Sequence, residues 1–302
     1  MKISMTLLVF MCCFLSQNIS AQNIDKKQTD VQKAGLKGKV KKITLKYFYA
    51  EDKFGEIVQT GNAANGKGEE FYTQYNENGF ITIHSEIGKD FNAPWDKESY
   101  KYNDMGKIIE HHIFEYNKKN GVYEMSETQK TYNYDGLGNK TEEIRWYEKN
   151  GNKIMLDTIK YIYDVNNNLL EKNLYSMGAL YEQNIYRYDA KNNAIEDVSF
   201  NKGNFSNPGK IKSTYKFDAN GFKVEFKKFS DDGSLIWMET YKNDIKGNVI
   251  EEKGYNRDGK LSENINYEYV YDQEGNWTKQ IKRYEGSNRL QLRIREIEYY
   301  IN

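Results

Sequence analysis

Carboxylates that could act in catalysis recur at one fixed spacing along the chain. In six segments a glutamate stands seven residues after an acidic or amide position. Glycosidases need a single pair of carboxylates in unlike environments, whereas a carboxylate repeated in six units is typical of a ladder of cross-strand hydrogen bonds or ion pairs. The chain offers no nucleophile–base pair and no phosphate loop. The sequence therefore predicts a protein without catalytic residues, and a hydrolase is the least favoured alternative. The six glutamates are Glu110, Glu142, Glu171, Glu196, Glu225 and Glu251.

The histidines and one acidic turn could bind a metal, but their arrangement does not favour it. His111 and His112 are neighbours, so in a strand they point to opposite faces and cannot share an ion. His84 has no second ligand at suitable spacing. The run Asp164–Asn168 matches the start of a calcium loop, yet the required glycine is missing and Tyr175 takes the position of the bidentate glutamate. The sequence predicts no metal site and no cofactor.

Tryptophan and tyrosine rings suggest a ligand-binding function, because flat aromatic surfaces can stack against a sugar or a peptide. The candidates for ligand binding are Trp95, Trp237, Trp146 and Tyr147. Trp146 occupies a repeated position, where packing between strands is the favoured interpretation. Trp95 and Trp237 lie away from the repeated motif and are the better binding candidates.

A short motif that recurs every 24 to 32 residues positions all of these side chains. One clear copy reads Tyr132-Asn-Tyr134-Asp135-Gly-Leu-Gly138-Asn139. An Asp or Asn side chain can accept a hydrogen bond from a backbone N–H two residues on, and Gly or Asn most readily takes a positive φ. Together they predict a type I turn closed by a bulge, which joins two antiparallel strands. The acidic or amide positions are Asp52, Asn76, Asn103, Asp135, Asp164, Asp189, Asp218, Asp244 and Asp272, and the positions three residues later are Gly55, Gly79, Gly106, Gly138, Asn167, Asn192, Gly221, Gly247 and Gly275.

The segments between the turns alternate as strands do, and aromatics stand two residues apart before the turn, as in Tyr100 and Tyr102 or Tyr186 and Tyr188. Each of about nine units is two strands and two turns. The sequence thus predicts an all-β fold in which antiparallel hairpin repeats form a long, twisted and curved meander, as an open or partly closed barrel or shell that hides its edges. We expect the paired tyrosines, the glutamate and a later aromatic, such as Trp146, to share one face.

The first 21 residues have the composition of a secretion signal. Lys2 supplies the positive start, Met5–Leu15 the apolar run and Ile19–Ala21 a small-residue cleavage site. Lipid attachment at Cys12 is the alternative, disfavoured because large residues precede that cysteine. We expect a secreted protein, periplasmic or extracellular, with a flexible lead-in over residues 22–38 and a single repeat domain over residues 39–302.

Composition excludes several other classes of protein. Removal of the signal leaves a net charge near −1, whereas a nucleic-acid binder would carry a basic face. No apolar run after position 21 could form a transmembrane segment. An outer-membrane barrel needs an uncharged lipid-facing band, but Glu and Lys occur in both alternating sets of residues. A mean hydropathy of −0.89 would suit a disordered chain, yet disorder does not fit aromatics that recur in register with almost no net charge.

The Tyr-x-Tyr-Asp-x-x-Gly-Asn core, as in Tyr132–Asn139, resembles the YD repeat of the Rhs-like family of extracellular bacterial proteins. The resemblance covers most of residues 45–300 and implies β-hairpin units that spiral into a shell. It also implies carbohydrate binding or a part in toxin delivery. The family usually has Gly-Arg where this chain has Gly-Asn, Gly-Lys or Gly-Phe, so a free-standing secreted repeat protein fits better than a toxin carrier.

These observations predict a secreted, noncatalytic recognition protein of the bacterial envelope, with a glycan as the expected partner. The alternative is a structural or adhesion module that binds another envelope protein, for which strand addition to an unpaired edge is one route.

Overall fold

The computed structural model describes residues 28–62, 70–87, 96–119, 122–149, 152–201 and 209–301, and these form one short helix and 19 strands of a single sheet. The predicted signal peptide, residues 1–21, lies outside the described residues. No helix in the described segments is long and apolar enough to cross a membrane. The elements are α1 (Asp30–Lys33), β1 (Val40–Lys53), β2 (Glu56–Asn62), β3 (Glu70–Tyr75), β4 (Ile81–Ile87), β5 (Asp96–Tyr102), β6 (Ile108–Lys119), β7 (Val122–Tyr134), β8 (Lys140–Lys149), β9 (Asn152–Tyr163), β10 (Leu169–Ser176), β11 (Ala179–Tyr188), β12 (Ala194–Asn201), β13 (Gly209–Phe217), β14 (Lys223–Phe229), β15 (Leu235–Asn243), β16 (Val249–Tyr255), β17 (Leu261–Tyr271), β18 (Trp277–Tyr284) and β19 (Arg289–Tyr299).

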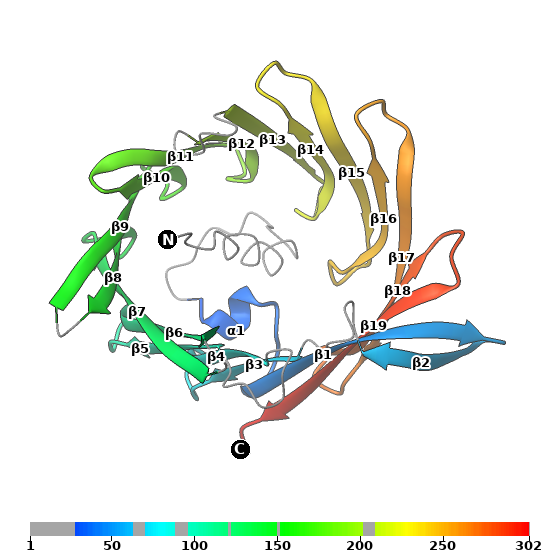
Figure 1. Ribbon diagram of the computed structural model, residues 1–302. Coiled ribbons are helices and arrows are strands. Elements are labelled where there is room, and N and C mark those ends of the chain that lie inside the picture. The colour runs from blue at the N-terminus through cyan, green and yellow to red at the C-terminus, as the bar shows by residue number, and fades with distance from the viewer. Residues whose placement is uncertain are drawn as a thin grey trace.

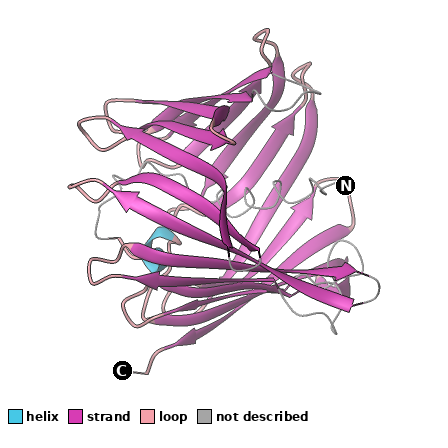
Figure 2. Ribbon diagram, turned by 60° about the vertical axis from the view of Figure 1, so that its left-hand side comes forward, coloured by secondary structure: helices cyan, strands magenta, loops and turns pink. Residues whose placement is uncertain are grey.

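The sheet closes into a barrel (Figures 1 and 2). Strands β3 to β19 pair antiparallel in chain order, and β1 pairs with both β3 and β19, which completes the ring. Strand β2 pairs with the second half of β1 and forms an arm that projects from the ring (Figure 1). The predicted all-β class and antiparallel hairpin meander are confirmed. Full closure leaves the ring without an edge, which removes the hazard of an unpaired strand.

One side chain and one left-handed residue build each tight turn, as the turn between β9 and β10 illustrates. Asp164 Oδ1 accepts hydrogen bonds from the backbone N–H groups of Asn166 and Asn168, both at 2.8 Å. The Asp164 carbonyl accepts from the N–H of Asn167, whose φ is 65°. The equivalent residues open and close the other turns of this rim. They are Asn76 and Gly79, Asn103 and Gly106, Asp135 and Gly138, Asp189 and Asn192, Asp218 and Gly221, Asp244 and Gly247, and Asp272 and Gly275, with φ from 62° to 84° at the second member of each pair.

A second irregularity follows each of these turns and was not predicted. In the β7–β8 pair Asn133 lies opposite Glu142, but Tyr134 lies opposite Lys140, so Thr141 is an extra, bulged residue. The same shift occurs at the corresponding Ile, Leu, Val or Thr of each other hairpin of this rim. One extra residue reverses which face of the sheet every later side chain occupies.

The bulge overturns the prediction that the glutamate and the later aromatic share a face with the tyrosines. Residues directly opposite each other in an antiparallel pair share a face, so Glu142 and Trp146 lie on the side away from Tyr132. The hydroxyl of Tyr102 bonds Asp30 of α1 at 2.9 Å, and α1 lies inside the ring (Figure 1), so the tyrosines face inward. Four of the recurring glutamates form ion pairs with the neighbouring strand on the outer face: Lys101–Glu110 (2.7 Å), Arg187–Glu196 (3.5 Å), Lys216–Glu225 (2.9 Å) and Lys242–Glu251 (3.0 Å).

Residues 28–38 of the predicted flexible lead-in over residues 22–38 lie against the barrel, and residues 22–27 lie outside the described residues. Thr29 and Gln32 form a capping box at the start of α1. Val31 and Leu36 are buried in an apolar cluster with Tyr75. Burial of these apolar side chains offsets the conformational entropy lost when the segment is ordered. A second apolar cluster lies on the opposite face of the sheet and consists of Ala50, Ile281, Leu290 and Leu292, with Phe48, Ile57 and Ile294 packed against it.

The two ends of the described chain together make one repeat unit. The N–H of Tyr300 donates to the carbonyl of Lys39 at 2.9 Å, as the N–H of the turn aspartate does in the other units. Gly38 has a φ of 77° and stands where the closing glycine belongs, and Tyr299 lies opposite Val40 next to a bulge. This split unit joins the ring without a covalent turn.

The turn at Asp52, predicted as the first of nine equal copies, differs from the rest. It joins β1 to β2 at the end of the barrel opposite the other turns, because it follows the far end of β1 from Val40. Its closing pair is Phe54 and Gly55, with φ of 59° and 90°. The ring therefore consists of eight hairpins and the split unit.

Alanine variants of two glycines can distinguish the free-energy cost of a left-handed backbone from that of a steric clash. Gly221 and Gly247 have φ of 82° and 84°, but only a β-carbon at Gly247 would meet a neighbour, at 2.5 Å from Phe222. We expect Gly221→Ala to destabilise the protein by about 1–2 kcal/mol through φ alone. Gly247→Ala should cost about 1–3 kcal/mol more through overpacking. Urea unfolding of both variants measures the difference, and equal losses would contradict it.

Candidate functional site

The inner face of the barrel carries a continuous array of phenols, here called the tyrosine wall. Its members stand directly before the turns and come from successive odd-numbered strands of the ring, so each turn places its tyrosines beside those of the next unit. Most of their rings are half-buried and are therefore partly open to solvent. The tyrosine wall consists of Tyr100, Tyr102, Tyr132, Tyr134, Tyr161, Tyr163, Tyr186, Tyr188, Tyr215, Tyr241, Tyr269 and Tyr271.

The tyrosine nearest the turn ties its strand to the preceding unit. The hydroxyls of Tyr134, Tyr163 and Tyr188 donate to backbone carbonyls at 3.1, 3.0 and 2.9 Å. Burial raises the pKa of Tyr134 and Tyr163 to about 12. These phenols stay protonated near neutral pH and act as hydrogen-bond donors.

The tyrosine two residues earlier bonds to acidic or imidazole groups on the inner face. Glu98 accepts from the Tyr100 hydroxyl and from His111 Nε2 at 2.9 Å, while His111 Nδ1 accepts from Tyr132 at 2.6 Å. Burial opposes ionisation of Glu98, but the bonds from His111 and Tyr100 outweigh it and lower its pKa to about 2. Burial also lowers the pKa of His111, which is therefore neutral near pH 7.

Glu143 forms the second charged centre of the tyrosine wall. Its carboxylate lies 2.7 Å from Lys140 Nζ and 3.3 Å from Lys130 Nζ, and it accepts from the Tyr161 hydroxyl at 3.1 Å. Burial opposes its ionisation, but the two ammonium groups outweigh burial and lower the pKa of Glu143 to about 2. The group is an ionised acceptor held by three donors.

Further around the ring the same combination of phenol and carboxylate recurs. Tyr215 bonds Asp197 at 2.5 Å, Tyr267 bonds Glu252 at 2.6 Å, and Tyr241 bonds Glu239. The inner face thus alternates aromatic rings with carboxylates that accept hydrogen bonds. That surface can stack against a polar ligand and bond its hydroxyl groups.

The line Tyr132–His111–Glu98 has the connectivity of a catalytic triad but not its electrostatics. Burial raises the pKa of Tyr132, whereas a nucleophilic phenol needs a lowered pKa or a base that takes its proton. His111 is only 4% exposed, so it is shielded by its own partners. The arrangement suits structural hydrogen bonding.

The structure does not bring together the four residues predicted to bind a ligand. Trp237 lies on the inner face, where its Nε1 donates to Glu239 at 2.8 Å and its ring covers Gly254. Trp146 lies on the outer face and donates to Thr131 at 2.9 Å. Tyr147, the next residue, therefore points inward, on a strand distant from β15 (Figure 1). Trp95 lies outside the described residues.

Each of the three histidines bonds to different partners. His111 faces inward, whereas His112 bonds Glu127 at 2.6 Å. His84 bonds the Thr73 hydroxyl at 2.9 Å. Among the described residues no group of three or more His, Cys, Asp or Glu side chains could hold a metal ion.

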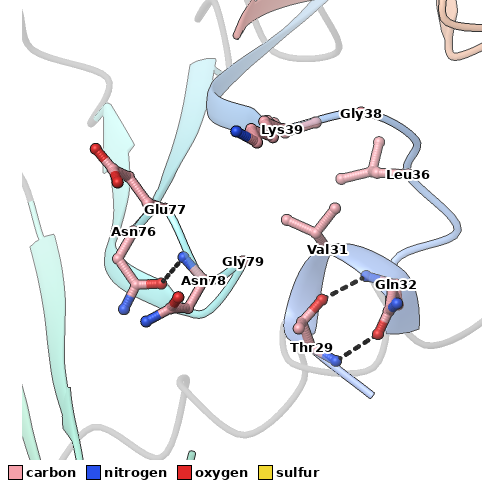
Figure 3. A pocket seen from close by; sticks show the side chains of 11 residues that line it. Thr29, Val31, Gln32, Leu36, Gly38, Lys39, Asn76, Glu77, Asn78 and Gly79 are labelled. Atoms are coloured by element: carbon pink, nitrogen blue, oxygen red, sulfur yellow. Dashed lines mark hydrogen bonds between the residues drawn. The ribbon is translucent and has the colours of Figure 1, made fainter. Parts of the chain in front are cut away.

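A pocket of about 260 Å³ lies apart from the tyrosine wall, between α1 and the first tight turn (Figure 3). Its lining includes Thr29, Val31 and Gln32 from the helix segment, Gly38–Val40 and the turn Asn76–Gly79. Thr29 and Gln32 bond each other, and Asn76 Oδ1 accepts from Asn78 N–H at 3.1 Å. Because these polar groups already bond one another, we interpret the pocket as part of the packing between α1 and the turn Asn76–Gly79 at this end of the barrel.

Sequence reasoning missed the tyrosine wall as a site because the paired tyrosines were expected only to share a face of the hairpins, and the ligand was sought at Trp95, Trp237, Trp146 and Tyr147. The signal that could have found it is the pair of aromatics before most of these turns, combined with a carboxylate one position after the recurring glutamate, as at Glu143. That combination becomes visible only when the bulge at Thr141 is taken into account.

The charges at Glu143 predict a loss of stability in acid. The pKa of Glu143 is about 2 in the folded protein and ordinarily 4.5, so its contribution is complete above about pH 4.5 and is lost as the pH falls toward 2. Glu143→Gln should lower the free energy of unfolding by about 1–3 kcal/mol at pH 7 and by less at pH 3. Urea unfolding at several pH values measures this. Glu142→Gln, on the outer face, is the matched control, and an equal pH effect in both variants would refute the assignment.

Comparison with protein-family models and with curated proteins finds no match. Among solved structures, a porin-like protein from Bacteroides uniformis is 14% identical, with a TM-score of 0.41 over 86% of this chain and 96% of that one. A porin-like protein from Bacteroides vulgatus is 13% identical, with a TM-score of 0.30 over 86% and 98%. The Tc holotoxin pore of Photorhabdus luminescens is 9% identical, with a TM-score of 0.28 over 72% of this chain and 14% of that one. At TM-scores below 0.5, nothing about this chain follows from these likenesses.

Proposed function

We propose that this protein is a secreted, noncatalytic recognition protein of the bacterial envelope that binds a carbohydrate on its tyrosine wall. One observation carries the proposal: half-buried phenol rings alternate with carboxylates that accept hydrogen bonds along the inner face. Rings stack on the apolar faces of sugars, and carboxylates accept bonds from sugar hydroxyls. The secretion signal predicted over residues 1–21 supports an envelope location, periplasmic or extracellular.

The repeat supports the same proposal. The Tyr-x-Tyr-Asp-x-x-Gly units form hairpins, and the YD-repeat proteins they resemble are expected to do the same. In the proposal the turns build the barrel and the tyrosines serve recognition, so the outward-facing Trp146 is not part of the binding surface.

Tyr186 and Tyr175 test which face binds. Tyr186 belongs to the tyrosine wall, and within the described segments its hydroxyl forms no hydrogen bond, so its loss removes mainly a ring. Tyr175 is on the neighbouring strand and faces outward beneath Lys160. We expect Tyr186→Ala to weaken oligosaccharide binding about 3- to 10-fold, as one stacking contact would, and Tyr175→Ala to leave it unchanged.

The measurement is a glycan array followed by calorimetry on the oligosaccharides that bind. Both variants should first show the far-ultraviolet dichroism of the parent protein. If Tyr175→Ala lost binding and Tyr186→Ala kept it, the inner face would not be the site.

A second candidate function, an adhesion module, has its own observation. The arm strand β2 pairs with β1 on one side, and no described strand pairs with its other edge. Its residues Gln59 and Thr60 are exposed, and an open edge can accept a strand from a partner.

For this candidate we expect Gln59→Pro to abolish capture of envelope proteins by the purified protein, because proline removes a backbone donor at the edge. Gln59→Ala is the matched control and should capture normally. If Gln59→Pro and Gln59→Ala captured envelope proteins equally while the protein bound glycan, strand addition would be excluded.

A further inference from the structure

Two arginines stand side by side on the inner face of β19. Arg293 lies opposite Tyr47 and Arg295 lies opposite Leu45 on β1, and the residues between and before them, such as Leu292, belong to the apolar cluster on the other face. Alternate residues of a strand share a face, so both guanidinium groups project inward. We call Arg293 and Arg295 the arginine pair.

Aromatic rings support both guanidinium groups. Arg295 Cζ lies 3.5 Å from the centroid of the Trp277 ring, and Arg293 Cζ lies 5.1 Å from that of Tyr47. Stacking on a ring is favourable for a guanidinium and leaves its N–H edge free for in-plane bonds. The rings therefore support two forks of hydrogen-bond donors on the inner face.

The arginine pair has no acidic partner in the part of the chain that the structure describes. Neither side chain forms an ion pair or hydrogen bond there, and the Nε atoms of both are buried without an acceptor. By contrast, Arg145 forms an ion pair with Asp157, although its Nε also lacks an acceptor, and Arg283 pairs with Glu268 at 2.7 Å and Asp52 at 2.9 Å.

The surroundings of Arg295 consist of phenols. Burial lowers the pKa of Arg295 to about 10, and the opposing influences come from Tyr75, Tyr47, Tyr269 and Tyr299. The group is still a cation near neutral pH. A half-buried cation without a counter-charge is costly, and an anion supplied from outside would remove that cost.

The arginine pair continues the tyrosine wall. Gln280, opposite Arg293 on β18, is 1% exposed, donates to the Tyr269 hydroxyl at 3.0 Å and leaves its Oε1 without a partner. A ligand lying along the tyrosine wall would therefore reach both guanidinium groups at the seam between β18, β19 and β1.

We propose that the arginine pair binds an anionic group of the ligand, a carboxylate, sulfate or phosphate, so that the carbohydrate bound on the tyrosine wall is an acidic one. This inference rests on the proposed function. Two adjacent forks match the paired oxygens of such groups better than an ammonium would.

The experiment compares three probes by calorimetry on the mature protein: uronate, sulfated and phosphorylated oligosaccharides as one panel, neutral oligosaccharides of equal length, and inorganic sulfate. We expect acidic oligosaccharides to bind at least tenfold more tightly than neutral ones. The double change Arg293→Gln with Arg295→Gln should remove that preference and leave neutral binding unchanged. Arg283→Gln, at a paired arginine away from the tyrosine wall, is the matched control and should keep the preference.

A competition on the unmodified protein protects the test against a variant that fails to fold. Inorganic sulfate should displace an acidic oligosaccharide and should not displace a neutral one. Neutral and acidic sugars bound equally, or a preference that survives the double change, would overturn the arginine pair as an anion site and leave the proposed function standing. If the protein bound sulfate but no sugar, and the double change abolished sulfate binding, the anion site would be upheld and carbohydrate recognition overturned. Binding of no probe would overturn both.

Discussion

The hairpins of the ring depend on one local interaction, the hydrogen bonds from backbone N–H groups to the carboxylate or amide that opens the tight turn. At Asp164 both bonds are 2.8 Å long, and the closing Asn167 takes a positive φ. Because the same bonds recur in turn after turn, neighbouring hairpins start in register, and register decides which side chains face inward. The barrel, the tyrosine wall and the outer ion pairs are all consequences of that repeated turn.

The bulge after each turn divides the chemistry of the two faces. It sends the recurring glutamates outward, where partners such as Lys242 pair with them at modest gain in water. It also brings a different set of acids, including Glu143, beneath the tyrosines, where burial strengthens hydrogen bonds and costs more for any unpaired charge. The arginine pair stands out on this inner face because its neighbours are rings and phenols in place of carboxylates.

Local chemistry was predictable and pairing across the chain was not. The turns at Asp135 or Asp272 follow from residue types within five positions, so the all-β hairpin architecture could be deduced from the sequence. The outward position of Glu142 depends on whether Thr141 is bulged, which only pairing between strands decides. The ordering of Val31 depends on a surface formed by distant strands. Trp146 and Tyr147 were predicted to bind one ligand, but they are consecutive residues of a strand and therefore face opposite ways.

The split unit has a consequence for the order in which the molecule is assembled. Its two halves, Gly38–Lys39 and Tyr299–Tyr300, are separated by almost the whole polypeptide, and β1 has no second neighbour in the ring until β19 has been synthesised. Hairpins can form one after another as the chain emerges, but the circle is completed last and by non-local contacts, which are the slow ones to establish. During synthesis the chain would therefore persist as an incomplete coil with two open edges, the stage at which chaperones would have most to protect.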